Sequence, residues 1–158
     1  MTTEAAPPLI GALVRRPAEA VHLRIVREAN EAGFTDLVPA HLAVLRYPGP
    51  NGRRPSELAA EVGATKQAMN YLLGQLEHLG YLDRRDDPDD LRSKRVHLTP
   101  RGEALRRAIR RTVTKIEAEL EAELGEASYA QLRSLLVRLN GTKAIAAERD
   151  ASSLSVRR

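Results

Sequence analysis

The chain has no cysteine and no tryptophan, and aromatic residues make up only 3% of its 158 residues. The absence of cysteine excludes disulfide bonds, thiolate zinc sites and thiol-based redox sensing, and it is compatible with a reducing compartment. The scarcity of aromatic residues argues against a single-strand nucleic-acid binder, because such proteins stack bases on aromatic side chains. A chain of this length can bury a core, which must be mainly aliphatic here.

Long apolar runs are also missing, and none approaches the ~20 residues that would span a membrane. The first eight residues lack the basic segment of a signal peptide. No glycine-rich phosphate loop, nucleophile elbow or H-E-x-x-H sequence is present. We therefore expect a soluble cytoplasmic protein with no membrane partner, no catalytic activity and no cofactor.

The four histidines give little support to a metal site. They lie far apart in the sequence, without ligand spacing, at His22, His41, His78 and His97. We expect them on the surface or packed between helices. A zinc-responsive regulator remains an alternative, because one or two histidines can still converge with a carboxylate.

Positive charge is concentrated in one part of the chain. The net charge is +4. Residues 53–115 hold 14 Lys and Arg against 9 Asp and Glu, whereas the rest of the chain holds 11 against 12. A local excess of basic residues is what neutralisation of DNA phosphates requires.

The basic segment carries the most informative pattern. Pro55–Val62 has apolar residues at helical spacing and ends at Gly63, and a second helix runs from Thr65 to about Leu79. Two short helices joined by a glycine-containing turn form a helix-turn-helix pattern. Two strand-like runs follow, at 81–85 and 95–99, around a charged hairpin at 86–94. A helix for the major groove beside a basic wing predicts a protein that binds duplex DNA.

The second helix of this pattern has a polar outer face near its start. We predict that Ala68, Leu72, Leu73 and Leu76 face inward. The predicted DNA-reading residues are Thr65, Lys66, Gln67, Asn70 and Tyr71. The amides of Gln67 and Asn70 can pair with adenine, and the helix start at Thr65 offers free backbone amides to a phosphate.

The wing supplies the second set of predicted DNA contacts, Arg84, Arg85, Arg92, Lys94 and Arg95. A guanidinium at a hairpin tip can enter a narrow minor groove. Asp90, two residues before Arg92, is close enough to brace that side chain, and Pro88 would stiffen the loop. A solubilising loop is the alternative, because four aspartates offset the positive charge.

Helices flank this module on both sides. We expect one or two helical turns at 9–14, and a long helix that Pro17 either begins or kinks and that ends at Gly33. Another helix begins near Pro39. Thr99 should cap a helix of roughly 25 residues that ends at Gly125.

Ser128 and Gln131 have the spacing of a capping box for a final helix. Its apolar stripe predicts a dimer interface, through Leu132, Leu135, Leu136 and Leu139.

These observations predict a mainly α fold: a winged helix-turn-helix with a small β-hairpin wing and long N- and C-terminal dimerisation helices. We divide the chain into a disordered N-terminus at 1–8 and N-terminal helices for dimerisation and core at 9–47. The DNA-binding lobe follows at 48–99. C-terminal dimerisation helices occupy 100–149, of which 143–149 can resume a helix, and a flexible tail occupies 150–158.

One segment carries a family resemblance. Asp90–Thr99 fits an Asp-x-Arg, five residues, Leu-Thr signature, and Leu76–Leu82 and Pro100–Gly102 fit its flanks. In these motifs and in the order of its helices the chain resembles the MarR family of winged-helix transcription regulators. It departs from the family pattern at Val38, where a Ser or Thr is expected, and in the Pro- and Gly-rich linker at 48–54.

The resemblance implies a homodimer bound to a palindromic operator in double-stranded DNA, usually as a repressor. It implies that Arg92 is the minor-groove arginine, that Asp90 braces it, and that residues 65–71 read the major groove. Family members often release DNA on binding small aromatic or phenolic ligands, so a small-molecule effector of unknown identity is a further expected partner. The alternative from a different class is a winged-helix protein-interaction module without a DNA role.

Overall fold

The structure is a computed structural model that describes residues 9–46, 48, 49, 51–143 and 145. The predictions of disorder at 1–8 and of a flexible tail at 150–158 fall outside these residues. The described elements are α1 (Ile10–Glu31), α2 (Pro39–Leu45), α3 (Pro55–Val62), α4 (Lys66–His78), β1 (Leu82–Asp87), β2 (Asp90–Leu98), α5 (Pro100–Leu124) and α6 (Glu126–Asn140).

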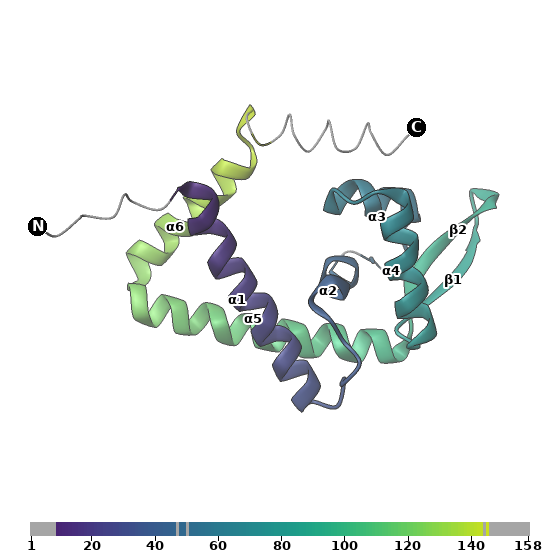
Figure 1. Ribbon diagram of the computed structural model, residues 1–158, viewed down its shortest axis with the longest axis horizontal. Helices are drawn as coiled ribbons and strands as arrows, with labels where there is room; N and C mark the ends of the chain where they lie inside the picture. The colour runs from purple at the N-terminus through teal and green to yellow at the C-terminus, as the bar shows by residue number, and fades with distance from the viewer. Residues whose placement is uncertain (1–8, 47, 50, 144, 146–158) are drawn as a thin grey trace, which may run out of the picture.

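The elements form two parts joined by α5 (Figure 1). The long α5 runs along the base, α1 crosses it, and α6 rises from the end of α5. At the other end of α5 lie α2, α3, α4 and the β1–β2 wing. The larger core cluster joins α2, α3, α4 and the wing through residues such as Leu45, Leu58 and Leu73, which are at most 1% exposed. A smaller cluster of Ile25, Leu42 and Ile116 joins α1, α2 and α5. The mainly α winged-helix prediction is confirmed.

The first helix is continuous where the sequence suggested a break. α1 covers 22 residues and contains Pro17 in its interior. Proline has no amide hydrogen and removes the bond to the carbonyl of Leu13. Both side chains are exposed, so the freed carbonyl is not sealed in a core. The predicted end is confirmed, since the helix stops at Ala32 before Gly33, whose φ is +95°.

The missing Ser or Thr at Val38 is replaced by a different cap. Nδ1 of His41 accepts a hydrogen bond from the backbone amide of Val38 at 3.3 Å. Pro39 occupies the first position of α2, where no amide hydrogen is needed. The buried His41 therefore performs the capping role that the sequence pattern did not reveal.

The wing has longer strands than the sequence predicted. β1 and β2 extend into the charged segment, and only Pro88 and Asp89 form the turn between them. The antiparallel register pairs Asp86 with Lys94 but Asp87 with Asp90. Residues 91–93 are therefore extra on β2 and form a bulge. A run of charged residues is typical of a loop, so the sequence predicts nine loop residues at 86–94, whereas backbone pairing extends into this segment.

The C-terminal helices match the prediction at α5 and differ at α6. The Thr99 hydroxyl caps α5 by accepting from the Gly102 amide at 3.1 Å. The α6 helix starts at Glu126, directly after Gly125, so the capping box predicted at Ser128 and Gln131 is wrong. Gly125 has φ +80° and links the two helices without a longer loop. Lys143 and Ile145 are helical, and the rest of 143–149 lies outside the described residues.

Gly102 lies where no side chain fits. A Cβ built on it would lie 2.1 Å from the carbonyl oxygen of Tyr81. We expect Gly102→Ala to lower the free energy of unfolding by about 1–3 kcal/mol, because overpacking forces the backbone to move. Denaturant unfolding would measure this loss. Gly74→Ala is the matched control, because a Cβ there meets nothing within 4 Å. Equal stability of Gly102→Ala and the native chain would contradict the close approach.

Candidate nucleic-acid interface

The helix-turn-helix is held by one apolar face on each of its helices. Leu58 and Ala59 of α3 are fully buried, as is Met69 of α4. Gly63 makes the turn between the helices with a left-handed backbone at φ +67°. The prediction that Ala68 faces inward is wrong. Ala68 is exposed and Met69 takes its place, because the apolar face of α4 follows Met69, Leu73 and Leu76, a spacing of four and three residues.

The outer face of α4 carries the polar residues predicted to read DNA. Thr65 precedes the helix, and its hydroxyl oxygen accepts from the Ala68 amide at 3.1 Å. Lys66 and Gln67 are exposed, and Asn70 is half-buried. Tyr71 is 67% exposed, a large fraction for an aromatic side chain. The structure therefore brings all five residues to the first two turns of one helix, with four of them open to solvent.

A glycine continues the same outer face. Gly74 lies three residues after Tyr71 and seven after Gln67, so the three share one side of α4. It is exposed, and no atom lies within 4 Å of where its Cβ would be. A glycine in a helix interior lowers helix stability by about 0.5–1 kcal/mol relative to alanine. Packing within the described part of the chain does not explain it, whereas close contact with an external surface would.

Most of the predicted wing cations are held by carboxylates. Arg84 Nε lies 3.1 Å from Glu77, and Arg85 Nη2 lies 2.9 Å from Asp83. Lys94 pairs with Asp86. These three pairs are at least partly exposed, so each contributes at most about 1 kcal/mol and can open when a phosphate competes. The structure brings these cations to one hairpin but does not leave them free.

Arg95 belongs to an ion cluster around the buried Asp87, and its own side chain is only 20% exposed. Its Nε lies 3.0 Å from Asp87 and its Nη2 lies 3.1 Å from Asp89. Asp87 is fully buried and also pairs with Arg54 Nε at 2.6 Å. This cluster fastens the segment before α3 to the wing. The pairing of Asp87 with Arg54 could not be predicted from the sequence, because 33 residues separate them and no local pattern links them.

The cluster keeps Asp87 ionised. Burial alone would raise the pKa of the Asp87 carboxyl. Hydrogen bonds from the Asp89 amide and the Arg54 guanidinium, together with the ion pair to Arg95, outweigh burial, and the pKa ends far below its usual range. A carboxyl with a lowered pKa stabilises the fold above its ordinary pKa, and that stability is lost as the pH falls through its value in the folded protein. The wing anchor is therefore intact at neutral pH.

Arg92 differs from the other wing cations. It lies in the bulge at residues 91–93, is exposed, and has no carboxylate partner in the described part of the chain. Asp90 does not hold its side chain as predicted. The Asp90 carboxylate accepts instead from the backbone amide of Arg92, at 3.1 Å. Asp90 thus fixes the backbone of the bulge that carries Arg92. Because a bulge changes the direction of the side chains on it, Asp90 also sets where Arg92 points.

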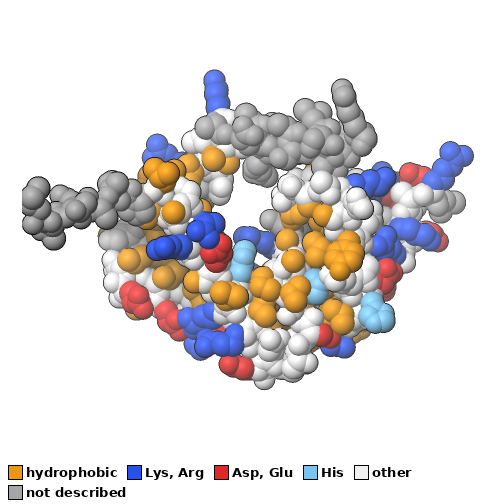
Figure 2. All heavy atoms as spheres, viewed as in Figure 1, with side chains coloured by type: hydrophobic (Ala, Val, Ile, Leu, Met, Phe, Trp, Pro, Cys, Tyr) orange, Lys and Arg blue, Asp and Glu red, His pale blue; other side chains and the backbone are white. Residues whose placement is uncertain are grey.

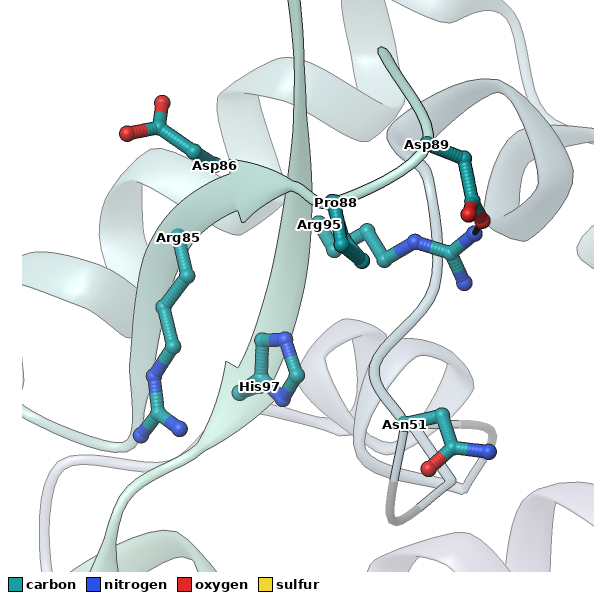
Figure 3. Close-up of a pocket in the computed structure, with 7 residues that line it drawn as sticks. All are labelled: Asn51, Arg85, Asp86, Pro88, Asp89, Arg95 and His97. Atoms are coloured by element: carbon teal, nitrogen blue, oxygen red, sulfur yellow. Dashed lines mark hydrogen bonds and ion pairs between the residues drawn. The ribbon is translucent and has the colours of Figure 1, made fainter. Parts of the chain in front are cut away.

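Residues 51–53 of the Pro- and Gly-rich linker pack on the base of the wing (Figure 3). Arg53 forms an isolated antiparallel bridge with Val96. The His97 ring packs against Gly52, where a Cβ would lie 2.5 Å from Nε2. An open pocket there is lined by Asn51 and His97 together with Arg85, Asp86, Pro88, Asp89 and Arg95. Residues 51–53 of the linker therefore have a defined place, and α3 begins at Pro55 as predicted.

A second polar contact fixes the base of α5. Tyr81 is fully buried and donates its hydroxyl hydrogen to Asp36, which also pairs with Arg101 at 2.8 Å. The Arg101 guanidinium lies 4.6 Å from the centre of the Tyr81 ring. Burial raises the pKa of Tyr81, and the bond to Asp36 raises it further. Asp36, in the loop after α1, therefore contacts both Tyr81, which precedes β1, and Arg101 of α5. These contacts hold the start of the wing and the start of α5 together.

The structure gives two findings on other classes of site. Among the residues it describes, no three His, Asp or Glu side chains gather as they would around a metal ion. Within the same residues, no helix combines the length and the apolar character that crossing a membrane demands.

Comparisons with known proteins agree with this architecture. Residues 35–93 match the MarR family. The chain is 30% identical over 87 residues to the HTH-type transcriptional regulator YkoM of Bacillus subtilis, a match that spans 55% of each chain and so about half the length of that relative. A crystal structure of the MarR family transcription regulator SP03579 superimposes with a TM-score of 0.71 and 25% identity, over 88% of each chain.

A second crystal structure is that of the Mycobacterium tuberculosis MarR family protein Rv2887 with salicylic acid. It has a TM-score of 0.63 and 26% identity, over 85% of this chain and 98% of that one. The matched residues 35–93 include α2, α3, α4 and most of the wing. Sequence signature, helix order, wing and solved relatives agree, and the chain belongs to the MarR family of transcriptional regulators with a winged helix-turn-helix fold.

Proposed function

We propose that this protein is a sequence-specific regulator of transcription that binds duplex DNA, without enzymatic activity. The observation that carries the proposal is the pairing of two exposed elements. The outer face of α4 presents Lys66, Gln67 and Tyr71, and the wing presents Arg92 without a carboxylate partner in the described chain. A helix start with amide side chains suits the major groove, and a free guanidinium suits the backbone or the minor groove.

The proposed assembly is a homodimer that forms through α1, α5 and α6. Not one residue of α6 is buried, and an isolated helix of 15 residues is marginal in water. Its stripe is open to solvent, with Leu132 41%, Leu135 50% and Leu136 40% exposed. Hydrophobic side chains also lie on the part of the surface that α1 and α6 occupy (Figure 2), and at the start of α1 Leu9, Ile10 and Leu13 are 52–82% exposed. A second copy would cover both surfaces by a two-fold operation.

Two copies would bind a palindromic operator. Symmetry would give two α4 helices and two wings, one set for each half-site, about one helical turn apart. We also propose that the protein is a repressor whose DNA binding changes when a small molecule binds. The support is the Rv2887 complex with salicylic acid, together with the geometry, since α5 runs through both parts and the small cluster of Ile25, Leu42 and Ile116 joins them. A ligand that changes the angle between those parts would change the spacing of the reading heads.

A direct test is fluorescence anisotropy with genomic DNA fragments at low and at physiological salt. The proposal expects tight binding to some fragments, weaker binding to scrambled ones, and affinity that falls as salt rises. A winged-helix protein-interaction module would bind no fragment even at low salt, and that result would reject the proposal. Metal analysis of untagged protein tests the zinc-responsive alternative. That alternative expects bound zinc and a DNA affinity that changes when the zinc is removed.

Gly74 gives a prediction in which stability and binding change in opposite directions. We expect Gly74→Ala to raise the free energy of unfolding by about 0.5–1 kcal/mol, since alanine is the better helix former. The same change should weaken DNA binding, because the added methyl lies on the face that meets the groove. Thermal denaturation and anisotropy would measure the two effects. A stabilised variant with unchanged affinity would show that this face does not approach DNA closely.

A further inference from the structure

A chain of hydrogen bonds leads from a buried side chain of α2 to the surface of α4. It begins at His41 of α2, which is 3% exposed. Nε2 of His41 lies 3.2 Å from Oε1 of Gln75, and Nε2 of Gln75 donates to the hydroxyl oxygen of Tyr71 at 3.1 Å. Gln75 lies one turn after Tyr71 on α4 and is half-buried. Neither His41 nor Gln75 belongs to the face predicted to read DNA.

The direction of every bond in the chain follows from its first member. The backbone amide of Val38 can only donate, so Nδ1 of His41 must accept and carries no proton. The ring proton of the neutral imidazole is then on Nε2, which donates to the Gln75 carbonyl oxygen. This fixes the orientation of the Gln75 amide, whose NH₂ group faces Tyr71. The Tyr71 oxygen accepts from it, and its own hydrogen is left for another acceptor.

We infer that Gln75, oriented by His41, is a positioning residue that makes Tyr71 a hydrogen-bond donor to duplex DNA. The Tyr71 hydroxyl has no acceptor in the described part of the chain, and the side chain is 67% exposed. DNA offers such acceptors, as phosphate oxygens and as base-edge atoms in the major groove. This inference rests on the proposed DNA binding and adds a residue that acts through Tyr71.

The test is a double-mutant cycle in the full-length protein. DNA affinity is measured for the genomic fragment that the native protein binds most tightly and for a scrambled duplex. Tyr71→Phe removes only the hydroxyl and should weaken binding about three- to tenfold, the effect of one hydrogen bond. Gln75→Glu reverses the polarity, because a carboxylate only accepts and would capture the Tyr71 hydrogen. Its added negative charge weakens binding in either background, so the inference concerns only the difference between backgrounds.

We expect Gln75→Glu to weaken binding at least about threefold more with Tyr71 present than in the Tyr71→Phe background. Gln75→Leu is a second variant without a charge, and it should weaken binding only when Tyr71 is present. A purely structural role for Gln75 would give the same loss in both backgrounds and would overturn the inference. An unchanged affinity of Tyr71→Phe would overturn it as well.

The two DNA targets locate the acceptor. If Tyr71→Phe loses affinity for both the genomic fragment and the scrambled duplex, the Tyr71 hydroxyl donates to a phosphate. If it loses affinity for the genomic fragment alone, the hydroxyl donates to a base edge. Failure of the native protein to bind any DNA would instead reject the proposed function. Binding by the native protein with no coupling between Tyr71 and Gln75 rejects only this inference. Thermal denaturation of each variant shows that it is folded.

Discussion

Arg92→Ala should weaken binding to the operator by about 1–3 kcal/mol, or roughly 5- to 150-fold, with little change in melting temperature. The reason is structural. Arg92 is exposed on a bulge that Asp90 fixes through the backbone, and no carboxylate of the described chain neutralises it. Its removal therefore deprives DNA of a contact and deprives the fold of little. Anisotropy titrations at fixed salt would measure the effect.

Two controls separate a specific contact from a lost charge. Arg92→Lys keeps the charge but loses the planar fork, so it should restore only part of the affinity. Arg110→Ala removes the same charge from the exposed side of α5 and should have a smaller effect. Equal affinity of Arg92→Ala and the native protein would remove Arg92 from the interface. Equal losses of DNA affinity in Arg92→Ala and Arg110→Ala would show that Arg92 acts only through its charge and makes no specific contact.

Leu136→Asp should separate the two copies. Leu136 lies in the middle of the exposed leucine stripe of α6. A two-fold interface would bury two new carboxylates at once, and each unpaired buried charge costs several kcal/mol. We expect the dimer dissociation constant to rise at least about a hundredfold. Sedimentation velocity would detect this as a shift from dimer to monomer at micromolar concentration.

The matched control lies on the same helix. Ser134→Asp adds the same charge on the side of α6 opposite the leucine stripe and should leave the dimer intact. Both variants should keep their helical circular dichroism, because no α6 residue is buried within one subunit. A folded, dimeric Leu136→Asp protein would refute the placement of the interface on this stripe.

Local signals were enough to predict much of this fold. Gly33, Gly63 and Gly125 mark helix ends through positive φ values. Thr65 and Thr99 mark helix starts through their side-chain caps. The helical spacing of apolar residues gave the inner face of α4, apart from the exchange of Ala68 for Met69. Such features depend on neighbours within one turn of the chain, so the sequence displays them directly.

Features that depend on distant partners could not be predicted in this way. The wing strands continue into the charged segment because Arg54 and Arg95 neutralise Asp87. The cap of α2 comes from a histidine, which also contacts Gln75, 34 residues away.

The candidate site shows the same division between local and distant information. The exposed residues of α4 were found from the sequence. The sequence did not separate Arg92, which has no ion-pair partner in the described chain, from wing cations such as Arg95 that are already paired.

We propose that two joined copies place their α4 helices and wings in successive turns of one duplex. Capture of genomic fragments on the purified protein, followed by sequencing, tests it most directly. We expect enriched fragments that share an inverted repeat, with half-site centres about 10–10.5 base pairs apart or a multiple of that distance. Enrichment that fails to exceed the protein-free control, or that contains only single unpaired half-sites, would contradict it.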